Sequence, residues 1–145
     1  MNLGTEVKIS ACLAYASGTA AREGATLDML GYDGVLAIMT CATLAASSVG
    51  DIHFETSTDS GFSGGTDLTG TAIATANDDD DEIFVVDLYK PLERYVRAVV
   101  TKDTSNAMAE SVTYIQYKSD KKPVTNTVTD TLTYELHVSP ARGTK

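Results

Sequence analysis

The chain has 145 residues, of which 43% are hydrophobic and 21% are charged, so it is long enough for one globular domain with its own core. No apolar run is long enough to span a bilayer, and no basic region followed by an apolar block marks a secretory signal. A net charge of −9 argues against a direct role with nucleic acid or anionic membranes, because both require a basic surface. We therefore expect synthesis in a cytoplasm, with use there or assembly there into something later released.

The first quarter of the chain predicts one weak strand and an ambiguous segment. Thr5–Leu13 alternates weakly between apolar and polar residues, as an edge strand would. Ala14–Gly24 is small, polar and interrupted by glycine, so both a short helix and an extended arm are compatible with it. In a chain without an export signal, we expect Cys12 and Cys41 to be reduced and buried rather than joined in a disulfide.

A turn signal precedes the next apolar run. Asp33-Gly34 between apolar segments predicts a hairpin, although a strand running through Tyr32 with a bulge at Gly34 is the alternative. Val35–Leu44 is predicted to be a core strand, and Asp51–Ser57 alternates as a second strand does.

The middle of the chain contains a long loop. Thr58–Gly70 consists mainly of Ser, Thr, Asp and Gly, and Phe62 is expected to pack this loop back onto the body. Thr71–Ala76 predicts a short strand, and Asn77–Asp81 predicts a turn.

The strongest apolar material lies in Glu82–Thr101, which contains two extended runs joined at Tyr89-Lys90-Pro91. The first run has apolar residues on both faces, which predicts a strand covered by the core on one side and by a second layer or subunit on the other. The second run alternates, with Val96, Ala98 and Val100 on one face. We expect the two runs to be the central strand pair of the fold.

The last third adds one strand and an extended tail. Ser111–Tyr117 alternates, Ser119–Pro123 breaks the pattern, and Val124–Lys145 is rich in Thr. Seven or eight short strands without an amphipathic helix predict an all-β fold, an antiparallel β-sandwich or jelly-roll-like domain with extended N- and C-terminal arms. We divide this single domain into an N-terminal arm or edge strand (1–24), a β-sandwich core (25–123) and a C-terminal extended arm (124–145).

The sequence shows no arrangement typical of catalysis. Gly61-Phe62-Ser63-Gly64-Gly65 matches the G-x-S-x-G nucleophile elbow, but no helix follows it, so a flexible turn is favoured over a hydrolase that uses Ser63. His53 and His137 have no recognisable acid, nucleophile or metal-ligand spacing. We predict no catalytic residues, no cofactor and no metal site, and hence a protein for binding, structure or assembly rather than an enzyme.

Two charge clusters leave alternatives open. Asp78–Glu82 fits a solvated hairpin turn, a cation site or an acidic handle for a basic partner, although it lacks the Gly and final Glu of a Ca²⁺ loop. Lys118, Lys121 and Lys122 form one basic spot that could pair with the acidic turn of a neighbouring copy.

Arg94 and Arg97 flank Tyr95, where they are either exposed or salt-bridged, and both residue types are common interface anchors.

Several segments together resemble small virion proteins of tailed bacteriophages. They are ATLDMLGYD (25–33), DIHFETSTDSGFS (51–63), DDDDEIFVVDLYKPLERYVRAVVT (78–101) and the ending KKPVTN…HVSPARGT. In that group a GYD-type strand start, a strand followed by a Ser/Asp/Gly loop, and a DL…RYLR strand pair recur. The resemblance covers most of Thr26–Thr144. It implies a head decoration (cement) protein, a β-rich module that binds the outside of the capsid and usually acts as a trimer.

The expected partners are therefore the major capsid protein and other copies of this chain in a homotrimer on the virion exterior. Extended termini could add strands to neighbouring subunits. The residues expected at oligomer or capsid contacts are Ile83, Val85, Tyr95, Arg97, Lys121, Lys122, Pro140 and Arg142.

The alternative function is a phage tail or surface β-sandwich that binds a host glycan. Its aromatic platform would come from Phe62 in the Thr58–Gly70 loop and from Tyr114 or Tyr117. The supply of rings is thin, with 7 Tyr, 3 Phe and no Trp.

Overall fold

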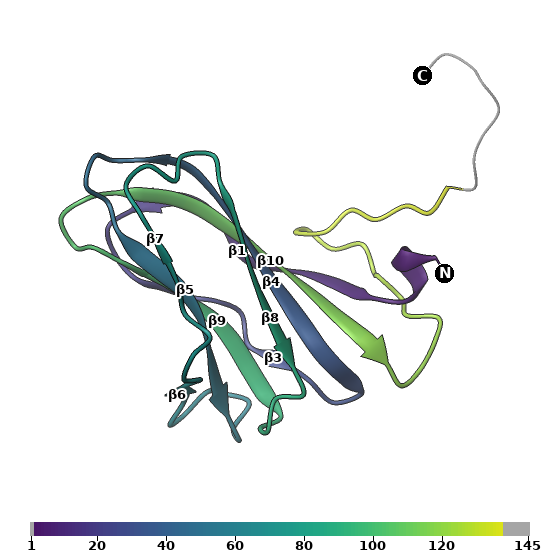
Figure 1. Cartoon of the computed structure of the whole chain (residues 1–145). Helices are drawn as coiled ribbons and strands as arrows, with labels where there is room; N and C mark the ends of the chain where they lie inside the picture. Colours follow the sequence, from purple (N-terminus) through teal and green to yellow (C-terminus); the bar gives the residue numbers. More distant parts are fainter. Residues whose placement is uncertain (1, 138–145) are drawn as a thin grey trace, which may run out of the picture.

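The computed structural model describes residues 2–137, which contain ten strands and one short 3-10 helix (Leu3–Thr5). The strands form two antiparallel sheets that pack against each other (Figure 1), which confirms the predicted all-β sandwich. No helix among these residues is long and apolar enough to cross a membrane.

The first sheet has four strands in the order β1-β10-β4-β8. Its bounds are Lys8–Gly18 (β1), Met108–Ser119 (β10), Tyr32–Leu44 (β4) and Ile83–Tyr89 (β8). Alternate side chains of β4, β10 and β8 point into the sandwich, as the period of two of a strand requires. β1 and β8 are the two edges of this sheet.

The second sheet has six strands built on a central pair, β5 (Gly50–Ser57) and β9 (Tyr95–Lys102). The short strands β2 (Arg22–Glu23) and β3 (Leu27–Asp28) pair with β9. The short strands β6 (Thr66–Asp67) and β7 (Ile73–Thr75) pair with β5.

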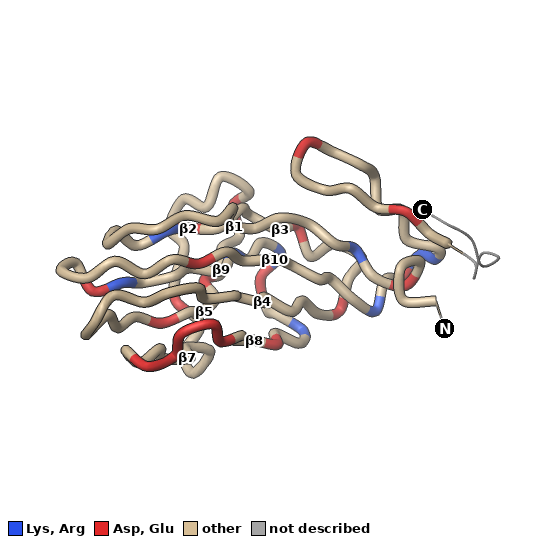
Figure 2. Tube along the Cα trace, turned by 90° about the horizontal axis from the view of Figure 1, so that it is seen from above, with Lys and Arg blue, Asp and Glu red and all other residues tan. Residues whose placement is uncertain are grey.

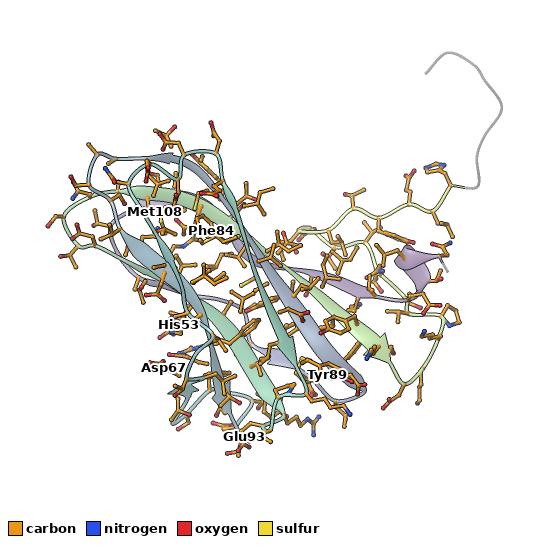
Figure 3. All side chains as sticks on the ribbon, viewed as in Figure 1. His53, Asp67, Phe84, Tyr89, Glu93 and Met108 are labelled. Atoms are coloured by element: carbon orange, nitrogen blue, oxygen red, sulfur yellow. The ribbon has the colours of Figure 1, made fainter. Side chains whose placement is uncertain are left out.

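The core lies between the two sheets and contains a buried tyrosine whose hydroxyl is hydrogen-bonded. Tyr114 is fully buried, its ring stacks on Phe54 at 6.5 Å between centroids, and its hydroxyl accepts a 2.6 Å hydrogen bond from the Ala98 N–H. Phe84 and Met108, labelled in Figure 3, also lie in this interior. The hydroxyl is thus satisfied where an unpaired polar group would destabilise the core.

The expectation of a central pair formed by the two runs of Glu82–Thr101 is wrong. β8 pairs only with β4 in the four-stranded sheet, whereas β9 lies in the six-stranded sheet, so residues 90–94 cross between the sheets. Lys90 has φ = 53° and is followed by Pro91, which fixes its own φ, and together they turn the chain out of the first sheet.

The acidic turn also crosses between sheets instead of closing a hairpin. β7 belongs to the six-stranded sheet and β8 to the four-stranded sheet, so residues 76–82 connect the two layers. The sequence pattern correctly predicted a connection between two strands here, but alternation shows which residues share a face of a strand and does not show which strands pair.

Neither the hairpin nor the bulge considered at Asp33-Gly34 is present. β4 runs through Tyr32 without interruption, and its pairing with β10 is in register on both sides of Gly34. The Tyr117 ring lies where a side chain at position 34 would be, so any Cβ at Gly34 would clash with it. Gly34 is needed for the close approach of this ring.

The two terminal segments lie side by side (Figure 1). The Val124 N–H donates to the Thr5 carbonyl at 2.8 Å, and the buried Asn126 bonds to three main-chain groups between Gly4 and Ile9. Beyond this point the chain makes a small turn closed by the Thr129–Leu132 bridge. Residues 1 and 138–145 are outside the described part, and with them the predicted contact residues Pro140 and Arg142.

Candidate interaction surface

The edge strand β8 exposes large apolar side chains on its outer side. Phe84 and Val86 point into the core, whereas Ile83 and Val85, which alternate with them, are 60% and 45% exposed. Within one chain this strand is therefore covered on its inner side only, and not on both sides as the sequence predicted. A second layer over Ile83 and Val85 would have to come from another molecule.

Aliphatic side chains continue from β8 across the outer side of the four-stranded sheet. Val85 pairs with Ile38 across β8 and β4, and Leu36 pairs with Ile115 across β4 and β10. Ile115 pairs in turn with Ile9 of β1. Opposite side chains of antiparallel strands lie about 5 Å apart, so these residues form a continuous surface. We call this surface the apolar face; its members, all exposed or half-buried, are Ile9, Leu36, Ile38, Ile83, Val85 and Ile115.

The free edge of β8 adds main-chain groups to this surface. The Lys90 N–H donates to the Asp33 carbonyl at 2.7 Å, and the Cys41 N–H donates to the Glu82 carbonyl at 2.9 Å. Bonded pairs alternate in an antiparallel ladder, so Val85 and Asp87 direct their N–H and C=O groups away from β4. An unpaired edge of this kind is a template for a strand from another chain.

The opposite margin of the apolar face borders the C-terminal segment. Ile9 and Ala11 line a hollow of about 210 Å³ together with Thr127 and Leu132 of that segment. The face is therefore flanked by the C-terminal segment at β1 and is open at β8.

Tyr95 and Arg97 lie on the other side of the molecule from Ile83 and Val85. They point outward from β9, on the outer side of the six-stranded sheet. Arg97 is held by Glu55 at 2.6 Å and Glu23 at 2.7 Å. Its guanidinium also lies 4.3 Å from the centre of the Phe62 ring. Arg97 is thus salt-bridged within the chain. Because Tyr95 and Arg97 lie on the opposite side of the molecule from Ile83 and Val85, one flat interface could not include all four residues.

Lys121 and Lys122 are exposed after the end of β10, in a region of mixed charge. Lys122 forms an ion pair with Glu6, and Lys118 donates to the Tyr89 hydroxyl at 3.2 Å. Lys121 lies beside Asp120 in the lining of a hollow of about 470 Å³. Acidic residues thus lie among these lysines, so the cluster is not the purely basic spot that the sequence indicated.

The acidic turn is partly used by the chain itself. The Asp80 carboxylate accepts from the Leu44 N–H, and the Asp79 carboxylate accepts from the Ala76 N–H, both at 2.6 Å. A hydrogen bond with Asp79, and the repulsion between the two groups, raises the pKa of the Glu82 carboxyl. The remaining carboxylates of this turn are exposed. Figure 2 shows the run of acidic residues that leads into β8.

The residues behind the glycan and hydrolase hypotheses have structural roles. Phe62 is buried under Arg97, and Tyr114 is in the core, so neither ring is available to stack on a sugar. Ser63 is exposed in a turn that Asp59 closes by accepting from the Ser63 N–H at 3.2 Å. The exposed Tyr89 stacks on Tyr117 at 6.5 Å, which leaves one surface aromatic pair.

Sequence reasoning missed four members of the apolar face. Ile9, Leu36, Ile38 and Ile115 escaped notice although the run Val35–Leu44 is apolar on both faces, as the run in β8 is. That two-sided pattern was the available signal for Leu36 and Ile38, and the structure shows that both runs belong to one sheet. Ile9 and Ile115 lie in other strands, where no such pattern marked them.

Comparisons with known proteins show the fold only. No protein-family model matches the chain, and no curated protein matches it. Among solved structures, the chain is similar to the PBSX exported protein XepA, with a TM-score of 0.55 and 18% sequence identity. The match covers 94% of this chain and 45% of that one, so the chain spans less than half the length of this neighbour.

Proposed function

We propose that the protein is a structural virion protein of a tailed phage, a capsid decoration (cement) protein that binds the major capsid protein on the outer surface and stabilises the head. The observation that carries this proposal is the apolar face, which continues to the unpaired edge of β8. Large apolar patches on a soluble protein mark contacts with other proteins. The resemblance of several segments to small virion proteins of tailed bacteriophages supports the same class of protein.

The proposed occupant of the apolar face is a second copy of the chain, in a homotrimer. A neighbouring strand would pair with the main chain of Val85 and Asp87 while its side chains cover Ile83 and Val85. A trimer needs a head-to-tail contact between two different patches, because only such a contact closes a three-membered ring. Three copies would then bind the capsid with the avidity of linked weak contacts.

The test combines solution mass with binding to capsids. Purified protein is added to phage heads that carry no decoration protein, and its mass is measured by light scattering. We expect a trimer, saturable binding, and heads that resist heat or chelator better than undecorated ones. A monomeric protein that neither binds nor stabilises the heads would overturn the proposal.

Variants of exposed residues separate this contact from folding. Val85→Asp places a charge in the apolar face and should yield a folded monomer with reduced binding to the heads. Leu92→Asp is the matched control, because Leu92 is 97% exposed and lies in the connection between β8 and β9, outside the apolar face. Equal masses and equal binding for both variants would rule out the apolar face as the trimer contact.

A second candidate, binding of a host glycan, now depends on the Tyr89–Tyr117 pair. Lys118 lies 4.5 Å and Lys90 5.5 Å from the centre of the Tyr89 ring, so a polar ligand could stack and bond there. Glycan-array binding that Tyr89→Ala abolishes would support this function. A silent array would leave the decoration role as the stronger proposal.

A further inference from the structure

Four titratable side chains gather on the outer side of the six-stranded sheet, far from the apolar face. Asp51, His53 and Glu55 alternate with buried residues of β5, so all three point outward. β6 places Asp67 directly opposite Glu55. Figure 3 shows His53 and Asp67 next to each other on this margin of the sheet.

Three of these side chains converge on one point. One donor atom each from His53, Glu55 and Asp67 lies within 4.8 Å of the others. The two β5 residues share a face because they are two positions apart, and the third comes from the paired strand. Three side chains that converge in this way from two strands could hold a metal ion.

Asp51 sets the orientation of the imidazole. His53 Nδ1 lies 2.6 Å from the Asp51 carboxylate, which can only accept, so Nδ1 carries a proton. In the neutral ring the lone pair is then on Nε2, which lies 3.5 Å from the Asp67 carboxylate. A carboxylate that accepts from one ring nitrogen while the other binds a metal is a recurrent support of histidine ligands.

The local charge favours a bound cation. Glu55 and Asp67 are opposite each other in the ladder, and like charges in that relation destabilise a sheet. Arg97 bonds one oxygen of Glu55 at 2.6 Å but is shared with Glu23. Among residues 2–137, Asp67 has no ion pair apart from its contact with His53.

We propose that His53, Glu55 and Asp67 bind a divalent transition-metal ion of the Zn²⁺ class, with Asp51 holding the imidazole in place. Zn²⁺ accepts imidazole nitrogen and carboxylate oxygen together, whereas Ca²⁺ and Mg²⁺ prefer oxygen alone. Water would complete the coordination. The ion would link β6 to β5 and so close the connection of residues 58–65 that joins them, a role that the proposed virion function does not require.

Titration calorimetry with ZnCl₂ tests the site. We expect one ion per chain for the wild type and binding at least about tenfold weaker for His53→Gln and Asp67→Asn. His137→Gln is the control for the second histidine, which is exposed and paired with Glu135. Asp130→Asn is the control for a lost surface carboxylate. Both controls should bind like the wild type.

The competing arrangement is a protonated His53 that bridges Asp51 and Asp67 without a metal. It predicts no saturable Zn²⁺ binding by the wild type, and that result would overturn the proposal, as would equal binding by Asp67→Asn and Asp130→Asn. Asp67 is 75% exposed, so Asp67→Asn should fold normally. A Co²⁺ absorption band in the wild type that is absent in Asp67→Asn gives an independent readout.

Discussion

Glu110 is a fully buried carboxylate held between two cations from other strands. Its oxygens lie 2.8 Å from the Arg22 guanidinium of β2 and 2.7 Å from the Lys102 ammonium at the end of β9. Lys102 is itself 1% exposed. The three charges join the two sheets at one end of the sandwich, and none of them was singled out by sequence pattern.

Removing the Glu110 carboxylate should strongly destabilise the fold. Glu110→Ala leaves Lys102 buried without its counter-charge, and we expect the free energy of unfolding in denaturant to fall by about 3–5 kcal/mol. Glu135→Ala, at an exposed position, should change it by less than about 0.5 kcal/mol. The pair of changes Glu110→Leu and Lys102→Met should recover most of the loss, and a single variant as stable as the control would contradict this account.

We expect the ionisation of the two thiols to lower the free energy of unfolding at high pH. Burial raises the pKa of Cys12 and of Cys41 from 9.0 to about 11. Between these values the unfolded chain releases thiol protons that the folded chain keeps, so stability is present below pH 9 and is lost as pH rises toward 11. At pH 10 the loss is about 1.4 kcal/mol per thiol.

Denaturant melts at pH 7.5 and pH 10 check this expectation. The wild type should lose more stability between the two pH values than a Cys41→Ala variant does. The titration of other groups cancels because it occurs in both proteins. The cavity left by the substitution cancels because it is present in the variant at both pH values. An equal loss in both proteins would show that Cys41 ionises in the folded state.

At the scale of the element, Asn126 attaches the C-terminal segment to the start of β1. Its side chain accepts from the Ile9 N–H at 2.8 Å and donates to the Gly4 and Val7 carbonyls at 3.0 Å. Asn126→Ala leaves these main-chain groups without partners, and we expect a loss of about 2 kcal/mol in the free energy of unfolding. Thr127→Ala, at an exposed position, is the control. Faster amide exchange at Ile9 in the first variant alone would locate the effect.

Two truncations separate the attached part of the C-terminal segment from the rest. A chain that ends at Thr127 keeps Val124 and Asn126 and should fold like the full chain. A chain that ends at Pro123 loses both and should be less stable, because Val124 is buried and its N–H bonds to Thr5. Equal melting temperatures for the two truncations would contradict this division.

The existence of most elements could be predicted, but their partners could not. The run in β8 was expected as a strand, yet its neighbour is β4 and not β9. A period of two shows which residues share a face, whereas pairing depends on contacts between residues far apart in the chain. The same reason explains why the cluster of His53 and Asp67 was missed, since only the β5–β6 pairing brings these residues together.

At the scale of the whole molecule, the sandwich buries one side of each sheet and leaves the apolar face uncovered. If copies associate through this face, folding and association are linked, so thermal stability rises with protein concentration. We expect the melting temperature of the wild type to increase over a hundredfold concentration range. Val85→Asp should remove that increase while Leu92→Asp keeps it, and a wild-type melting temperature independent of concentration would argue against self-association.

The sequence by itself determined the class of the fold, because the alternating apolar residues of β5, β9 and β10 are satisfied only by sheets that bury one side. It also indicated that Ile83–Leu88 has an apolar second side. Only the tertiary structure decided that this second side belongs to an edge strand and joins Leu36, Ile38 and Ile115 in one exposed surface. Neighbours across a sheet are selected by the register and packing of distant segments, and these depend on the free energy of the whole chain rather than on any local pattern.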